Sequence, residues 1–321
     1  MKTELPKISN QIKLEDVEQI LEKNFSSLVG KFYIFQLEWL NRSYQKFKDH
    51  DKNLILSFLI LKTLNFYANH LTKISMNEYY SKDIIEIEKF NISDISKNLN
   101  ISKETCRRKI LELENEDVII RREKKITIDR SKSSFRPHKP PLDSIKSISN
   151  VLNIALKILF QNKILNKVLS SAEIEKNIIE NFSYAWKFFL EMQILNYQRW
   201  KATYNDLETF HIFGICVVNQ EIELRKSLNL DTKAIKRMDY FKKISDHQNQ
   251  GINAMSISEM SSIPRGTVVR KLKFLLKKKM VHIDKKKHYH ITADEKIYQT
   301  GDATAKSFSI FTTKIFNLIM L

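Results

Sequence analysis

Apolar residues recur every three to four positions over most of this chain, which is the spacing of one face of an α-helix. Proline and glycine, which interrupt helices, occur only five times each among 321 residues. The pattern therefore predicts a mainly α-helical protein. Its long helices are expected at about Leu14–Lys48, Asn53–Leu71, Ile145–Leu169, Ala172–Asn205, Leu207–Lys226 and Ala303–Leu321.

Residues 91–129, which we call the first basic module, follow a different pattern. Apolar positions predict one short helix around Ile92–Leu99 and a second around Cys106–Leu113, with Ser102 as its N-cap. Two short helices that share a small core across a tight turn form a helix-turn-helix. The next segment, Val118–Ile128, has two β-rich runs around a charged turn, which indicates a β-hairpin of the kind called a wing.

Residues 253–293, the second basic module, repeat this pattern. A short helix around Ile257 is followed by a turn and a second helix, for which Pro264 suits the first position because its missing amide would be unbonded there. The hairpin spans Met280–Ile291, with three consecutive lysines at its turn.

Outward positions of the second short helix and of the hairpin carry the side chains that we predict to contact DNA. The N-terminal end of such a helix enters the major groove, and the hairpin contacts phosphates. The predicted residues of the first basic module are Ser102, Lys103, Glu104, Thr105, Arg107, Arg108, Arg121, Arg122, Lys124 and Lys125. Those of the second basic module are Arg265, Thr267, Val269, Arg270, Lys273, Lys285, Lys286, Lys287 and His288.

The two halves of the chain resemble each other. Val17–Ser26 matches Ile174–Ser183 at an offset of 157 residues, and Gln36 meets Gln193 at the same offset. The two basic modules match at an offset of 162, so we expect a small insertion within residues 226–252. These matches predict an internal duplication.

Three of the five prolines lie within residues 130–149, which we interpret as a linker. The predicted domains are therefore residues 1–129 and residues 150–321, each with long helices followed by a basic module. The second domain ends in an additional helix.

Net charge supports a polyanionic partner. The chain carries +17 overall, and residues 255–290 hold ten basic against two acidic side chains. Cys106 and Cys216 lie far apart and predict neither a disulfide framework nor a zinc site. His282, His288 and His290 lie in the second hairpin, where we interpret them as surface or phosphate neighbours, with no metal or other cofactor expected. Because no signal peptide or long apolar run is present, we expect a cytoplasmic protein without membrane contact.

Aromatic residues are dense in the long helices, from Phe32 to Phe47 and from Tyr184 to Trp200. We expect them to form the core between helices. A ring-lined pocket for a small aromatic effector is the alternative.

The basic modules resemble bacterial winged-helix regulators through Ile101, Ser102, Thr105, Arg108, Ile110 and Leu111, and through Ile263, Thr267, Arg270, Leu272 and Leu275. Together with the flanking helices, the arrangement is similar to that of MarR-like regulators, which are normally homodimers with one such unit per chain. The resemblance implies two winged helix-turn-helix domains in tandem. Their long helices would form an intramolecular pseudo-dimer, so that the protein acts as a monomer.

The sequence thus predicts a transcription regulator that binds an asymmetric double-stranded DNA site through two unlike winged helices. A plasmid-type replication initiator, which is also basic and has two winged helices, is the main alternative, and a chromosome-structure protein is a third. An enzyme is not expected, because no glycine-rich phosphate loop or activated nucleophile is evident.

Overall fold

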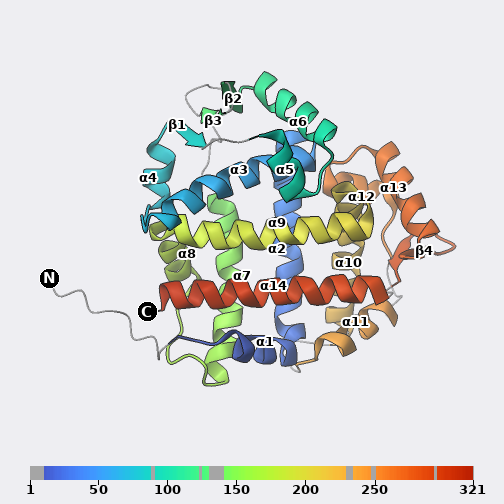
Figure 1. The fold of residues 1–321 in the computed structure, drawn as a ribbon. Helices are drawn as coiled ribbons and strands as arrows, with labels where there is room; N and C mark the ends of the chain where they lie inside the picture. The colour runs from blue at the N-terminus through green and yellow to red at the C-terminus, as the bar shows by residue number, and fades with distance from the viewer. Residues whose placement is uncertain are drawn as a thin grey trace.

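A computed structural model describes residues 11–87, 91–122, 125–129, 141–228, 234–246, 251–292 and 295–320. The described chain is mainly α-helical and has two small antiparallel sheets, as the apolar pattern predicts (Figure 1). In the described part of the chain, no helix is long and apolar enough to cross a membrane.

The elements of the first half lie between Leu14 and Gln161. They are α1 (Leu14–Lys23), α2 (Phe25–Phe47), α3 (His50–Asn69), α4 (Met76–Ser81), β1 (Ile84–Ile87), α5 (Ile92–Leu99), α6 (Lys103–Asn115), β2 (Ile119–Arg122), β3 (Lys125–Asp129) and α7 (Leu142–Gln161). Elements of the second half are α8 (Ser171–Glu180), α9 (Phe182–Tyr204), α10 (Leu207–Leu228), α11 (Arg237–Asp246), α12 (Ala254–Ser261), α13 (Arg265–Lys277), β4 (Val281–Ile283), β5 (Tyr289–Ile291) and α14 (Glu295–Ile319).

The second half repeats the order of elements of the first. Helices α1 and α8 each have 10 residues, and α2 and α9 each have 23. The short helices α5 and α12 have 8 residues each, and α6 and α13 have 13 each. The chain therefore contains two similar successions of helices, each with a helix pair and a hairpin near its end.

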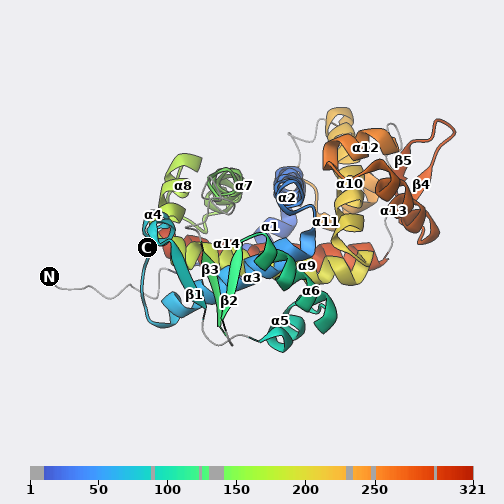
Figure 2. The same cartoon turned by 90° about the horizontal axis from the view of Figure 1, so that it is seen from above.

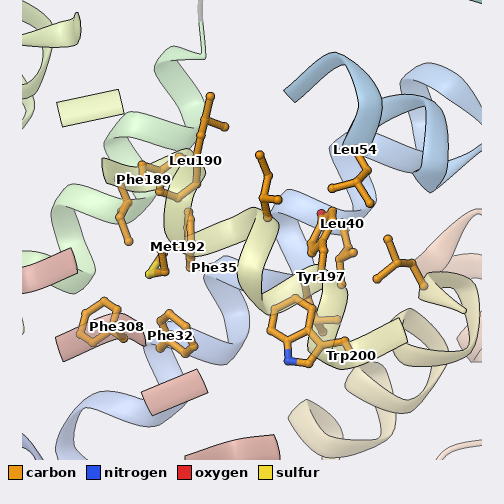
Figure 3. Packing of buried hydrophobic residues seen from close by; sticks show 14 of the residues in the cluster. Phe32, Phe35, Leu40, Leu54, Phe189, Leu190, Met192, Tyr197, Trp200 and Phe308 are labelled. Carbon is orange, nitrogen blue, oxygen red and sulfur yellow. The ribbon is translucent and has the colours of Figure 1, made fainter. Parts of the chain in front are cut away.

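Long helices of the two halves pack against each other rather than forming two separate cores. Helix α3 lies along α9, and α10 lies along α2. The centre contains rings and aliphatic side chains from both halves, including Phe35, Phe189, Leu190 and Tyr197 (Figure 3). Burial of these apolar surfaces is the main stabilising contribution to the fold.

Backbone contacts between the halves also occur in matched pairs. The Ser26 amide at the start of α2 donates to the Ile235 carbonyl (3.1 Å), and the Ile235 amide donates to the Ser26 hydroxyl (2.8 Å). Ser183, at the start of α9, forms the same two hydrogen bonds with Ile74, both at 3.0 Å. Each half thus completes the start of a long helix in the other half.

Two of the predicted long helices are each divided in two. The expected helix from Leu14 to Lys48 breaks at Asn24, whose side chain donates to the Ile20 carbonyl (2.9 Å) and caps the end of α1. Asn181 caps α8 in the same way through the Asn177 carbonyl (2.8 Å) and divides the expected helix from Ala172 to Asn205. An asparagine amide competes for the free carbonyls at a helix end, which apolar periodicity alone does not reveal.

The predicted linker of residues 130–149 is too long at its C-terminal end, because α7 begins at Leu142. Pro141 directly precedes this helix, where the absence of an amide hydrogen is tolerated. Residues 130–140 lie outside the described residues. The C-terminal helix also begins earlier than expected, at Glu295 rather than Ala303.

Candidate nucleic-acid interface

The first basic module contains a compact helix pair, α5 and α6. Asn100 ends α5 in the left-handed conformation (φ 50°), and the Ser96 hydroxyl donates to the Ile101 carbonyl across the turn (2.6 Å). Ser102 is the N-cap of α6 and accepts a hydrogen bond from the Thr105 amide (3.1 Å), as the sequence predicts. The fully buried side chains Ile95, Leu99, Cys106, Ile110 and Leu113 form the core of this pair.

A three-stranded sheet follows, with strand order β1-β3-β2. In its register Ile128 lies opposite both Ile85 of β1 and Ile119 of β2, and all three are buried. Strand β1 was not predicted from the sequence. Its four residues are mostly isoleucine and offer too short a run to distinguish a strand from a helix by periodicity.

The second basic module has the same construction. Ser262 ends α12 in the left-handed conformation (φ 59°), and the Ser258 hydroxyl donates to the Ile263 carbonyl (2.7 Å). Pro264 is the N-cap of α13 rather than its first helical residue, because its ψ of 135° is extended. Arg265 is therefore the first residue of the helix. The fully buried side chains here are Ile257, Ile263, Val268, Leu272 and Leu275.

A tight turn joins β4 and β5. The Asp284 amide donates to the His288 carbonyl (3.0 Å), and the Asp284 carboxylate accepts from the His288 amide (2.9 Å). This last hydrogen bond lowers the pKa of Asp284. Lys287 adopts the left-handed conformation (φ 63°) in the same turn. Outside the hairpin, Ile252 pairs with Tyr289 through two backbone hydrogen bonds of 3.1 and 2.9 Å, in the place that β1 occupies in the first sheet.

A lysine–aspartate pair attaches each helix pair to the long helices. Lys109 of α6 lies 2.6 Å from Asp49, the N-cap of α3, and Lys271 of α13 pairs in the same way with Asp206, before α10. Burial raises the pKa of Asp49, but hydrogen bonds from Lys109 and from the Lys52 amide lower it further, so the net shift is downward. These two lysines therefore hold the modules in place and do not point outward.

Most arginines predicted to contact DNA in the first basic module have acidic neighbours. Arg107 pairs with Glu104 (2.9 Å) and Arg121 with Glu114 (3.0 Å). Arg108 lies 3.9 Å from Glu112, a longer ion pair. Lys103 is exposed, and Thr105 is half-buried by its contact with Ser102. Arg122 ends β2, Lys125 begins β3, and Lys124 lies outside the described residues.

Six cations of the second basic module that we predict to contact DNA form no ion pair among the described residues. Arg265, Arg270 and Lys273 are exposed on α13, and none forms an ion pair within the described chain. The same holds for the three lysines of the hairpin turn, Lys285, Lys286 and Lys287. Thr267, Val269 and His288 are half-buried beside them. This module therefore presents six predicted contact cations that have no acidic partner among the residues described.

Comparison with protein-family models, with curated proteins and with solved structures gives no match for this chain. The geometry of the two modules therefore carries the functional argument by itself.

Sequence inspection missed a further exposed basic run, Lys277, Lys278 and Lys279, at the C-terminal end of α13. The three consecutive lysines could have been noticed in the sequence. They lie at the C-terminal end of α13, whereas the N-terminal end is the one expected to enter the DNA groove.

The histidines of the second hairpin are not all at the surface, although the sequence interpretation expected them there. The His282 and His290 rings stack at 5.0 Å, and His290 is buried.

Proposed function

We propose that this protein is a sequence-specific regulator of transcription that binds double-stranded DNA through two winged helices. The observation that carries this proposal is the group of six unpaired cations on α13 and on the turn between β4 and β5. Such cations favour a polyanion, because neutralising phosphates releases the counterions condensed on DNA. Their positions, on the N-terminal part of a second short helix and on the adjoining hairpin, suit a groove and a phosphate backbone at the same time.

Topology supports the assignment of both modules as winged helices. Each has two short helices with a shared buried core, followed by a hairpin, and each adds a third strand segment to that hairpin. This segment is β1 in the first module and the single residue Ile252 in the second. A small sheet of this kind holds the hairpin beside the second helix, so that both can touch one duplex.

Matched contacts between the halves support an intramolecular pseudo-dimer that arose by duplication. The Ser26–Ile235 and Ser183–Ile74 pairs are exchanged between the halves, as equivalent contacts are in a twofold-symmetric dimer. In Figure 1 the helix pair α5–α6 lies at the top of the molecule and α12–α13 on the right, and in Figure 2 the two pairs lie toward opposite sides of the molecule. One chain would thereby present two DNA-binding modules, as a conventional homodimer does.

Selection of bound duplexes from a random pool, followed by affinity measurement on the selected site, tests this function. We expect a defined sequence motif, and we expect the variant Arg265→Ala/Arg270→Ala/Lys273→Ala to lose at least about 100-fold in affinity, because each good arginine–base contact contributes about 1–3 kcal/mol. The matched control is Lys146→Ala/Lys157→Ala/Lys167→Ala. It removes the same charge from exposed positions on and after α7, away from α13 in both views (Figures 1 and 2).

Equal losses in the two triple variants would indicate non-specific attraction by net charge and would contradict the proposal. Genome-wide mapping of bound sites separates a regulator from a replication initiator. Sites scattered before genes support regulation, whereas a cluster of repeated sites at one origin supports initiation.

A further inference from the structure

A cavity of about 810 Å³ lies between α1, α2, α9, α10, α11 and α14. This volume falls in the range of sites for drug-sized ligands. Its wall is mainly apolar and includes the rings of Phe32, Tyr33, Trp200, Tyr204, Phe213 and Phe308. The indole N–H of Trp200 donates to Thr304 (3.2 Å), so its hydrogen bond is already formed and its ring can serve as an apolar wall.

Acidic side chains line one end of this cavity. Glu15, Glu18 and Glu22 lie on one face of α1, and Asp302 faces them from α14, whereas the cavity has only two cations, Arg237 and Lys306. Arg237 is held between Glu22 (2.7 Å) and Asp302 (2.6 Å). The cavity is therefore net negative in a protein whose overall charge is +17.

Glu18 provides the second, independent indication of a ligand. Its Oε1 atom is buried and accepts no hydrogen bond from the described residues. Leaving a buried carboxylate oxygen without a donor is unfavourable, and a cation beside it would remove that cost. At the equivalent position of the second half, 157 residues later, Glu175 lies on α8 outside the cavity.

We infer that this cavity is a binding site for an apolar organic cation of drug size. Its charge would lie beside Glu18, and its apolar body would lie among the rings, whose faces also attract cations. The site goes beyond the proposed function, because binding there requires no DNA.

The cavity also adjoins the second basic module. Ile291, the last residue of β5, lines it, and the Gln220 side chain joins the Ile291 amide (2.7 Å) to the Ile244 carbonyl (2.8 Å). A ligand bound in the cavity would therefore shift these hydrogen bonds and the second hairpin that they hold. This consequence rests on the proposed function, and the binding site itself does not.

Three phenyl-bearing probes of different charge test the inference by calorimetry and thermal unfolding on the full chain without DNA. They are tetraphenylphosphonium, which is a cation, triphenylphosphine oxide, which is neutral, and tetraphenylborate, which is an anion. We expect tetraphenylphosphonium to bind and to raise the unfolding temperature, and the other two to bind at least about tenfold more weakly, since one favourable charge contact is worth about 1.4 kcal/mol or more.

Two kinds of variant locate the site. Glu18→Gln should weaken tetraphenylphosphonium binding by about tenfold, whereas the matched control Glu175→Gln should not. Ala305→Trp and, independently, Val217→Trp should abolish binding by filling the cavity, and unfolding without ligand establishes that each variant is folded. Tighter binding of tetraphenylborate, absence of tetraphenylphosphonium binding, or unchanged binding in a folded cavity-filling variant would overturn the inference.

Discussion

The side-chain amides of Gln36 and Gln193 donate hydrogen bonds to each other. Each Nε2 lies 3.1 Å from the other residue's Oε1, and both side chains are buried in the core. The two glutamines are 157 residues apart, which is the offset that relates α1 to α8 and α2 to α9. A reciprocal pair of this kind is what a symmetry axis between two copies of one residue would produce.

Removing one glutamine of this pair should cost more than removing both. Gln36→Leu or Gln193→Leu leaves a buried amide without a partner and should lower the free energy of unfolding by about 1–3 kcal/mol. The double variant replaces both partners by apolar groups of similar size and should be close to neutral. A double-mutant cycle by denaturant unfolding measures the coupling, and additive losses would show that the pair is not coupled.

Lysines at the turn of the second hairpin should determine the salt dependence of DNA binding. In Lys285→Ala/Lys286→Ala/Lys287→Ala we expect the slope of log affinity against log salt to fall by about 0.9 for each phosphate that the variant no longer neutralises. Affinity on the selected duplex is measured between low and physiological salt. An unchanged slope would remove this hairpin from the interface, and the α7 triple variant is again the control.

Arginines on the two second helices should differ from the lysines by contacting base edges. Replacing Arg108, Arg265 or Arg270 by Ala should cost about 1–3 kcal/mol and relax the preference at one base pair. Arg107→Ala should have the same effect. In the natural chain, Arg107 must first break its ion pair with Glu104 before it can contact a base. Affinities for all single-base variants of the site are compared, and a uniform loss would identify that arginine as a phosphate contact.

A buried histidine pair should make the fold sensitive to acid. His50 Nε2 lies 3.3 Å from His211 Nδ1, and burial lowers the pKa of His50 to about 4 and that of His211 well below its usual value. The unfolded chain, with a histidine pKa near 6.5, therefore takes up protons first as the pH falls. The histidine pair should therefore lower stability from about pH 6.5 towards pH 4, with about 3 kcal/mol of that loss coming from His50 alone.

Unfolding of His50→Gln as a function of pH measures this decline, which should be smaller than in the natural chain. His70 is exposed, so His70→Gln is the matched control and should leave the pH profile unchanged. If His50→Gln follows the same acid profile as the natural chain, the histidine pair is not the cause.

Unlike second helices should make the DNA site asymmetric. Lys103 and Glu104 begin α6, whereas Arg265 and Gly266 begin α13, so the starts of the two helices offer different donors and only α6 begins with an acidic acceptor. One monomer should occupy two unlike half-sites centred about 10 base pairs apart. Replacing one half-site by a copy of the other should cost about 1–3 kcal/mol per mismatched pair.

Measurement of molecular mass in solution and selection from random duplexes check both parts of this prediction. A stable dimer on a palindrome, with one module unbound, would contradict the monomeric pseudo-dimer and leave the winged helices unaffected.

The sequence alone determined the features that depend on local periodicity. Apolar spacing placed the long helices and both short helix pairs, and Ser102 was identified as an N-cap because hydroxyl side chains accept hydrogen bonds from the first turn. Periodicity did not determine helix ends. Capping groups divide two expected helices at Asn24 and Asn181, and α7 begins three residues before the expected Ile145, directly after Pro141.

Only the tertiary structure decided which equivalent residues meet. The sequence aligned Gln36 with Gln193, but contact between them depends on how α2 crosses α9. The tertiary structure likewise decided that Lys109 and Lys271 point inward to Asp49 and Asp206. Arg265 and Arg270 form no ion pair among the described residues. The cavity beside Glu18 is of the same kind, because it requires side chains from six helices far apart in the chain. Long-range packing brings such groups together, and no local pattern records it.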